Sequence, residues 1–342
     1  MNRKKFLGTA AMIAGTPWLS GFTGKGQGGD EDEIPVIPGY LSDGDWVGIT
    51  APAGFITETD IQPALEQIRS WGFRVRVGNT IGKRDYTFAG TDEERLLDFQ
   101  RMLDDPELKA IMCARGGYGA VRIIDRLKWE GFKRNPKWII GFSDATVFHS
   151  HINRNIGVAS LHSKMTNSFP EDWDQAEPIQ KDTIHSIQQA LGGSPMEYSF
   201  AANTMNRTGK AEGVLVGGNL KTLESLSGSK SDIRTNGKIL FVEDTGEYLY
   251  SIDRMFWNLK RTGKLDHLEG LIVGGFRVKP DDPGEEFGED LYRIVLNKVK
   301  EYKYPVCFDF PVGHQRNNYA LKCGVRHRLS VQPDNCTLAE IR

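Results

Sequence analysis

Between residues 45 and 165, short apolar runs alternate with stretches in which apolar residues recur every third or fourth position. The apolar runs are typical of buried strands and cover residues 46–50, 73–77, 109–114 and 138–142. The intervening stretches have helical periodicity and cover residues 60–70, 91–99, 118–127 and 144–152. Because parallel strands need long crossover connections, this alternation predicts a doubly wound, mostly parallel sheet with helices on its faces.

The second half of the chain follows a less regular pattern. Residues 171–207 are polar and proline-containing, which predicts a connection that carries one helix near 178–191. Further strands are expected at 214–218, 238–244 and 270–276, helices at 251–262 and 287–300, and short strands at the end of the chain. We therefore expect an α/β fold with an N-terminal domain over 34–170 and a smaller C-terminal mixed α/β domain with short strands over 208–342.

The N-terminus resembles an export signal. A basic start at residues 3–5 (RKK) precedes a nine-residue apolar run, FLGTAAMIA, at residues 6–14. Such a run is too short to span a bilayer as a helix and is typical of a secretory signal peptide. The start also resembles a twin-arginine signal in which lysine replaces the second arginine. We expect residues 1–33 to be signal peptide and flexible leader, and the processed protein to be periplasmic without stable membrane insertion.

The overall charge and the cysteine spacing narrow the function classes. Lys and Arg number 43 against 45 Asp and Glu, so the net charge is -2 and no basic stripe favours nucleic-acid binding. A small-molecule or peptide substrate fits this balance better. No zinc-ligand spacing surrounds the four cysteines, and we expect no metal and no organic cofactor; the cysteines are Cys113, Cys307, Cys323 and Cys336.

Two glycine-containing turns lie where a predicted strand meets a predicted helix. In residues 141–145 (GFSDA), Ser143 has the context of a nucleophile elbow, although the second glycine of G-x-S-x-G is Ala145. The alternative is that Ser143 only caps the helix. Residues 115–119 (RGGYG) could form an oxyanion hole, a phosphate cradle or a plain tight turn. The spacings of dinucleotide and P-loop motifs are absent, so nucleotide binding is disfavoured.

A serine nucleophile needs a base and an acid that orients the base. Of seven histidines, His314 is the best placed, because it follows an apolar run and precedes polar residues. His162 ends a strand-like run and could support the catalytic groups. Glu243 and Asp244 end the apolar run 239–242, where a carboxylate needs a partner. The spacing does not decide between these two acids.

Together these motifs resemble the LD-carboxypeptidase family, the muramoyltetrapeptide carboxypeptidases, which have the microcin C self-immunity proteins as close relatives. The resemblance runs from about residue 45 to residue 329 and includes eight blocks in the family's order. The blocks are ITAPAG (49–54), FAGTDEER (88–95), ARGGYGAVRIID (114–125), IGFSDAT (140–146), GVLVGGNL (213–220), ILFVEDTGEYLYSIDRM (239–255), GLIVGGF (270–276) and PVGHQRNNYALKCG (311–324).

The resemblance implies a serine carboxypeptidase that removes the terminal D-alanine from murein tetrapeptide stems and acts as a homodimer. It implies a catalytic triad of Ser143, Glu243 and His314. It also implies an oxyanion hole made by the amides of Gly117 and Asp144. We also expect Arg115, Tyr118 and His162 to contact the substrate.

Two departures from the family's pattern bear on specificity. Ala53 stands where the family usually has serine, and residues 162–165 (HSKM) replace a His-Gly-Pro-Met-like run. Neither departure touches the triad. Two alternatives stay open: an immunity-type amidase that acts on peptidyl- or aminoacyl-nucleotides, and a muropeptide-binding protein without turnover. A nucleotide-dependent oxidoreductase is disfavoured, because no dinucleotide fingerprint is present.

Overall fold

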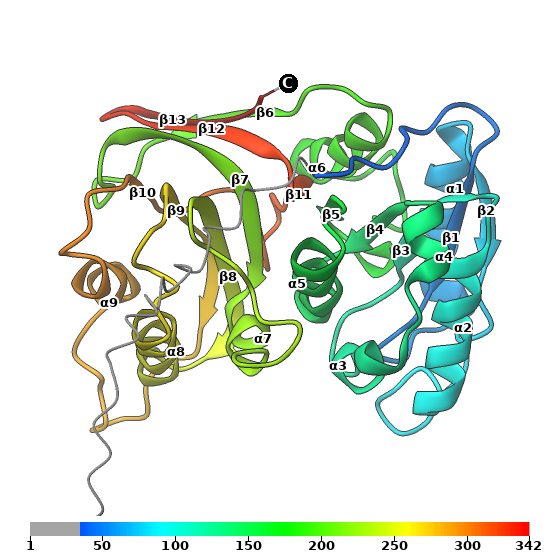
Figure 1. Ribbon diagram of the computed structural model, residues 1–342, viewed down its shortest axis with the longest axis horizontal. Helices are drawn as coiled ribbons and strands as arrows, with labels where there is room; N and C mark the ends of the chain where they lie inside the picture. The colour runs from blue at the N-terminus through cyan, green and yellow to red at the C-terminus, as the bar shows by residue number, and fades with distance from the viewer. Residues whose placement is uncertain (1–34, 342) are drawn as a thin grey trace, which may run out of the picture. The chain divides into compact units, whose positions relative to one another are not determined.

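The first sheet contains the alternating strands predicted from the sequence (Figure 1). A computed structural model describes residues 35–341, so the expected signal peptide and leader at 1–33 lie outside the described residues. Six strands lie in the order β11-β5-β4-β3-β1-β2, and all neighbours pair in parallel except β11 with β5. They are β1 (Trp46–Thr50), β2 (Arg74–Val77), β3 (Leu108–Cys113), β4 (Trp138–Gly141), β5 (Ser160–His162) and β11 (Leu321–Cys323). The predicted mostly parallel sheet is confirmed.

The helices between these strands follow the predicted periodicity, with one exception. They are α1 (Glu58–Ser70), α2 (Asp92–Asp104), α3 (Ala120–Ile123), α4 (Glu130–Arg134) and α5 (Thr146–Asn155). A capping box opens α2, where the Thr91 side chain accepts from the Glu94 amide and the Glu94 carboxylate accepts from the Thr91 amide. The predicted helix over 118–127 is shorter, because Gly119 has φ +149° and lies outside it, and a 3-10 turn follows at Ile124–Arg126.

A second, mixed sheet is built from the later part of the chain. Its order is β10-β9-β8-β7-β12-β13-β6; β7 to β10 pair in parallel and the others antiparallel. The strands are β6 (Glu197–Ala201), β7 (Gly209–Asn219), β8 (Lys238–Glu247), β9 (Gly270–Val278), β10 (Val306–Cys307), β12 (Arg326–Val331) and β13 (Asn335–Glu340). The helices are α6 (Pro178–Leu191), α7 (Leu220–Ser225), α8 (Leu249–Arg261) and α9 (Leu291–Lys298).

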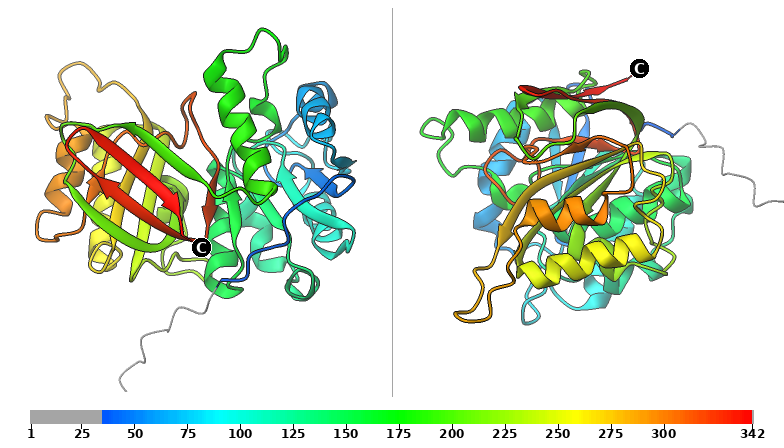
Figure 2. Two further views of the ribbon diagram at one scale, coloured as in Figure 1. Left: turned by 90° about the horizontal axis from the view of Figure 1, so that it is seen from above. Right: turned by 90° about the vertical axis from the view of Figure 1, so that its left-hand side faces the viewer.

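Helices α8 and α9 lie side by side across the face of the second sheet (Figure 2). Their apolar side chains, among them Phe256 and Ile294, are fully buried against β8 and β9. A different cluster is shared by the two sheets and contains Ile49 and Trp138 of the first sheet together with Phe241 of the second. The two sheets are therefore joined by a continuous apolar core.

Helix α5 lies between the two sheets and makes polar contacts with the second (Figure 1). The amide of Asn219, the last residue of β7, donates to Thr146 Oγ1 at 3.0 Å. A β-carbon at Gly218 would come within 2.5 Å of the same oxygen, so glycine allows this close approach. One turn further along α5, the Ser150 hydroxyl donates to the Ser231 carbonyl at 2.6 Å. These contacts fix the start of α5 against the end of β7.

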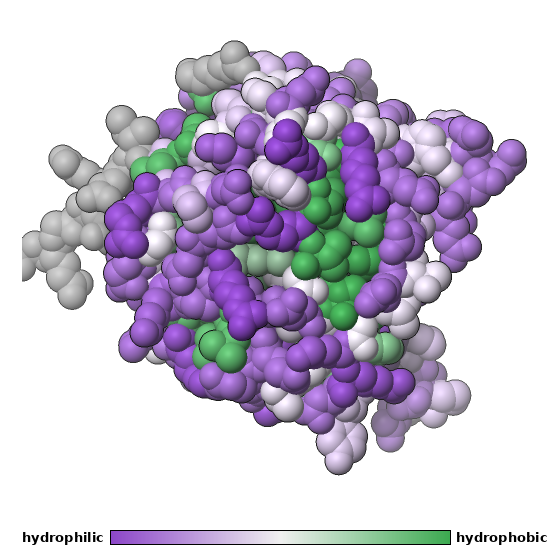
Figure 3. All heavy atoms as spheres, turned by 90° about the vertical axis from the view of Figure 1, so that its right-hand side faces the viewer, coloured by the Kyte–Doolittle hydropathy of each residue, from purple (hydrophilic) through white to green (hydrophobic). Residues whose placement is uncertain are grey.

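The side of the molecule that carries β2 is mainly hydrophilic, with a strip of hydrophobic side chains (Figure 3). Strand β2 is the outer edge of the first sheet, and its terminal residues Arg74 and Val77 are exposed. A charged residue on an edge strand opposes pairing with another chain. Within residues 35–341, none of the helices combines the length and the apolar character needed to cross a membrane.

Strand β11 also ties the two sheets together through a buried ion pair. Lys322 Nζ of β11 lies 2.9 Å from Glu340 Oε2 of β13, and both side chains are almost fully buried. Replacing Glu340 with methionine leaves a buried ammonium without its counter-charge. We expect the free energy of unfolding to fall by about 3–5 kcal/mol, measured by guanidinium denaturation.

The matched control is Glu212→Met, which removes the exposed pair between Arg328 and Glu212. Solvent screens that pair, so its loss should cost at most about 1 kcal/mol. Equal losses in the two variants would contradict a structural role for the buried pair.

Candidate active site

Ser143 lies in a strained turn at the end of β4. Phe142 is extended, with φ −144°, and Ser143 has φ +61°, which is uncommon for a residue with a side chain. A 3-10 turn at Ser143–Ala145 then leads into α5. The Ser143 side chain has no hydrogen-bond partner within residues 35–341, and in particular it caps no helix amide. The turn therefore has the geometry of a nucleophile elbow and not that of an N-cap.

The glycine-rich turn after β3 lies directly against Ser143. A β-carbon at Gly116 would come within 3.0 Å of Ser143 Cβ and 3.1 Å of Ser143 Oγ. In the described part of the chain, the amides of Gly117 and Asp144 have no hydrogen-bond acceptor. Amides without an acceptor, in a turn that contacts a serine and in the residue after it, are donors of the kind that an oxyanion requires.

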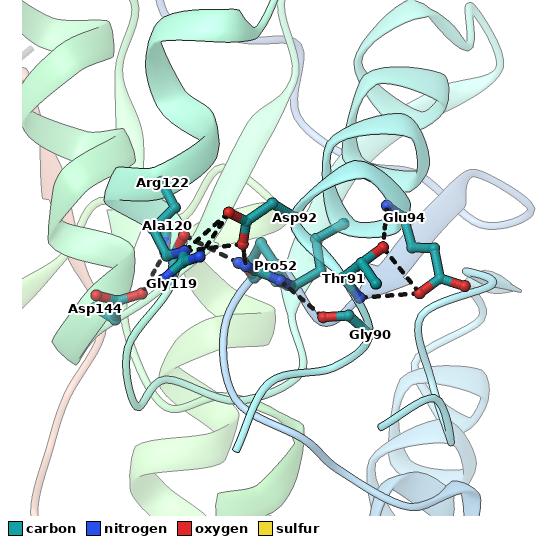
Figure 4. A network of polar contacts seen from close by, with 10 residues as sticks. Pro52, Gly90, Thr91, Asp92, Glu94, Gly119, Ala120, Arg122 and Asp144 are labelled. Atoms are coloured by element: carbon teal, nitrogen blue, oxygen red, sulfur yellow. Dashed lines mark hydrogen bonds and ion pairs between the residues drawn. The ribbon is translucent and has the colours of Figure 1, made fainter. Parts of the chain in front are cut away.

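A buried arginine of α2 holds this turn in place. Arg95, with no exposed side-chain surface, donates from Nη1 to the carbonyls of Pro52 at 2.8 Å and Gly119 at 3.0 Å, and it pairs with Asp92. Figure 4 shows how the network reaches Asp144, whose Oδ2 accepts from the Ala120 amide at 2.8 Å. Burial raises the pKa of Asp144 to about 6. The residue after Ser143 and the glycine turn are thus fixed to each other.

His314 and Glu243 are joined by a short hydrogen bond. His314 Nδ1 lies 2.6 Å from Glu243 Oε2, and the His314 amide donates to the same oxygen at 3.2 Å. A carboxylate can only accept in this hydrogen bond, so the geometry suits the tautomer with the proton on Nδ1, in which Nε2 is left to accept one. A β-carbon at Gly313 would approach Glu243 Cβ to 2.4 Å, so glycine at this position lets the histidine loop lie on the carboxylate.

Asp244, the other candidate acid, faces a different set of partners. Its Oδ1 accepts from Asn219 Nδ2 at 3.0 Å and its Oδ2 from the Lys221 amide at 2.8 Å. Burial raises the pKa of Asp244 to about 6. Glu243 is therefore the carboxylate that orients His314, while Asp244 ties β8 to the end of β7.

Phe142 links the histidine to the serine turn. Its ring centroid lies 4.9 Å from that of His314, so His314 packs on the residue that precedes Ser143. In the described chain no hydrogen bond joins Ser143 Oγ to His314. Catalytic hydrogen bonds are often long in unliganded enzymes and tighten when the substrate binds.

The three residues expected to contact substrate lie in different surroundings. Arg115 Nη1 donates to the Phe55 carbonyl at 2.8 Å, and Tyr118 is 53% exposed beside Phe88. Both remain at the surface next to the glycine turn. His162 is fully buried beside Phe142, and its ring nitrogens have no partner among residues 35–341. Burial lowers the pKa of His162 well below the usual value. A neutral His162 in this position has no surface with which to touch a substrate.

Sequence reasoning missed three residues of the site. Phe142, Thr146 and Asn219 contact the candidate catalytic residues or their neighbours but carry no reactive group of their own. Asn219 had a usable signal, because asparagine between an apolar strand and a helical stretch is a good N-cap, and its side chain does accept from the Thr222 amide at 3.0 Å. Within residues 35–341, no three His, Cys, Asp or Glu side chains are grouped as a metal site would require.

Known proteins are similar to this chain in sequence and in fold. Residues 47–163 match the LD-carboxypeptidase N-terminal domain and residues 212–329 the LD-carboxypeptidase C-terminal domain. A probable murein peptide carboxypeptidase of Bacillus subtilis is 33% identical over 86% of this chain and 91% of its own. The microcin C7 self-immunity protein MccF of Escherichia coli is 25% identical over 90% of this chain and 96% of its own.

A solved structure gives the same assignment. The muramoyltetrapeptide carboxypeptidase from Oxalobacter formigenes superposes with a TM-score of 0.76 at 26% identity, over 87% of this chain and 99% of its own. The two matched domains, the 33% identical relative and this shared fold cover the part of the chain that contains Ser143, Glu243 and His314. The chain belongs to the LD-carboxypeptidase family.

Proposed function

We propose that the protein is an exported serine LD-carboxypeptidase that removes the terminal D-alanine from murein tetrapeptide stems. The observation that carries this proposal is the 2.6 Å contact between His314 and the buried Glu243, on a loop that packs against the strained Ser143 turn. Similarity to proteins named as murein peptide and muramoyltetrapeptide carboxypeptidases supports the substrate class. The triad is Ser143, His314 and Glu243.

Acylation begins when His314 Nε2 takes the proton of Ser143 Oγ. The oxygen attacks the carbonyl carbon that precedes the terminal D-residue, and the amides of Gly117 and Asp144 stabilise the resulting oxyanion. Loss of one such donor typically lowers the rate by about 10²–10³-fold. Glu243 keeps the imidazole in the correct tautomer and balances its positive charge.

Collapse of the tetrahedral intermediate breaks the C–N bond, and His314 gives its proton to the leaving amine. D-alanine leaves and the shortened peptide stays as an ester on Ser143. His314 then activates water, which hydrolyses the ester and regenerates the serine. No step needs a metal or an organic cofactor.

Export would bring the enzyme to the compartment that contains the cell wall. The basic and apolar residues 3–14 support this proposal. N-terminal sequencing of the protein from separated cell fractions should find a shortened chain in the periplasm. Full-length chain confined to the cytosol would remove export from the proposal.

We also propose a homodimer, and light scattering during size-exclusion chromatography should give twice the mass of the processed chain.

An immunity-type amidase is the second candidate, favoured by the 25% identity to MccF. It would use the same residues on a peptidyl- or aminoacyl-nucleotide. Hydrolysis of an aminoacyl-adenylate analogue faster than tetrapeptide would favour that reaction. A muropeptide-binding protein without turnover would bind tetrapeptide and release nothing from it.

The nucleophile is tested by replacing Ser143 with alanine. Protein lacking residues 1–33 should release D-alanine from L-Ala-γ-D-Glu-meso-diaminopimelate-D-Ala, followed by mass spectrometry, and Ser143→Ala should lower this rate by about 10⁶-fold. Ser199→Ala, on the exposed strand β6, is the control and should keep the full rate. Equal release by wild type and Ser143→Ala would show that another group is the nucleophile.

The acid is tested by comparing the two neighbouring carboxylates. Glu243→Gln keeps the shape of the side chain but loses the charge that orients His314, so kcat should fall by about 10⁴-fold. Asp244→Asn leaves the contact to His314 intact and should cause a much smaller loss. The measurement is steady-state release of D-alanine by each variant. A greater loss in Asp244→Asn than in Glu243→Gln would reverse the assignment.

A further inference from the structure

Among the residues that the structure describes, one buried lysine has no polar partner, whereas the other buried lysines each have one. Five lysines are buried in the described part of the chain: Lys137, Lys164, Lys264, Lys298 and Lys322. Three of them form ion pairs, which are Lys264 with Asp232, Lys298 with Asp253 and Lys322 with Glu340. A fourth, Lys137, donates to backbone carbonyls. Within residues 35–341, Lys164 has no hydrogen-bond acceptor and no carboxylate.

The Lys164 side chain is largely desolvated, but its ammonium still reaches solvent. The residue is only 6% exposed and burial lowers its pKa to about 8, while Nζ is not one of the described side-chain atoms that are cut off from solvent. The group is therefore still mostly charged at neutral pH and has no counter-charge among the described residues. A largely desolvated charge that remains accessible is a position that an anionic ligand could fill.

The backbone around Lys164 is part of the catalytic edge of the first sheet. The amide of Ser163 donates to the Gly141 carbonyl at 3.1 Å, two residues before the nucleophile. On the other side, Met165 packs against the glycine turn, and a β-carbon at Gly116 would lie 3.3 Å from Met165 Cε. Lys164 is thus flanked by residues that contact the serine turn and the oxyanion turn. Ligands of parallel α/β sheets bind at this carboxyl edge.

The proposed reaction supplies an anion at the required place. A carboxypeptidase substrate carries its α-carboxylate on the residue that leaves, one residue beyond the scissile carbonyl. A lysine ammonium is a compact point charge on a flexible stem, which suits a carboxylate that must be bound and then released.

We propose that Lys164 binds the α-carboxylate of the terminal D-residue and so restricts the enzyme to peptides that end immediately after the scissile bond. This assignment rests on the proposed function. A diaminopimelate stem offers a second carboxylate, on its third residue, and the experiment separates the two.

The test compares three substrates: the diaminopimelate tetrapeptide, the same peptide ending in D-alaninamide, and the tetrapeptide with L-lysine as third residue. Wild type should prefer the free acid to the amide by about 10–100-fold in kcat/KM, the range for a hydrogen bond to a charged group. Lys164→Met should lose this preference through KM, with kcat little changed, because the contact is made before and during reaction. Lys164→Arg should keep most of it.

Controls separate recognition from structure. Lys264→Met removes a lysine that is paired with Asp232 and should lower the melting temperature while the acid preference stays. Lys164→Met loses no partner, so its melting temperature should not fall. Lys164→Gln is a second neutral variant in case methionine disturbs the packing.

Three results would overturn the assignment, and they differ from one another. An unchanged acid preference in both neutral variants shows that Lys164 does not bind the terminal carboxylate. If the neutral variants lose only the preference for diaminopimelate over lysine at the third residue, Lys164 binds the carboxylate of that residue instead. No D-alanine release by wild type rejects the proposed function, and the role of Lys164 with it.

Discussion

The contact between Thr146 and Asn219 brings the two halves of the proposed catalytic site together. Thr146 lies three residues after Ser143, and its hydroxyl accepts the amide that ends β7. The side chain of Asn219 then holds Asp244, the neighbour of Glu243 on β8. A short path of backbone and hydrogen bonds therefore runs from Ser143, after the last residue of β4, to Glu243 in β8. A small shift at this contact would move Ser143 relative to His314, and catalysis depends on distances of that order.

Several features of the proposed site are costly to the fold. Ser143 is held at a positive φ, and among the described residues Glu243 keeps one carboxylate oxygen buried without a partner, while the largely buried Lys164 has no counter-ion. Such features persist only where the surrounding fold enforces them, and they cluster at functional sites. Here the shared apolar core and the buried pair between Lys322 and Glu340 supply that support.

Much of the fold could be predicted from local pattern, because long elements with strong periodicity are specified locally. Helix α6 has the predicted limits 178–191, with Pro178 in its first turn. Pairing between distant segments could not be predicted. Strand β11 reaches the first sheet from the far end of the chain, and no local signal reveals that it pairs with β5.

For the proposed catalytic groups, too, local sequence predicted only some of the features. Local context singled out Ser143 and His314, because each lies where a buried strand meets a polar turn. Adjacent acids at a strand end look alike in local sequence, so the choice of Glu243 rested on the family resemblance. In the structure, the loop at Gly313 lies on Glu243 and brings His314 to its carboxylate. The burial of His162 and Lys164 was also unpredictable, since it depends on residues that pack over them from other elements.

The most direct test of the account is labelling with a fluorophosphonate, which phosphonylates activated serines, followed by peptide mapping. The account predicts a single adduct on Ser143 that forms slowly in His314→Ala and in Glu243→Gln. An adduct on another residue, or labelling of Ser143 at an unchanged rate without His314, would contradict the proposed triad.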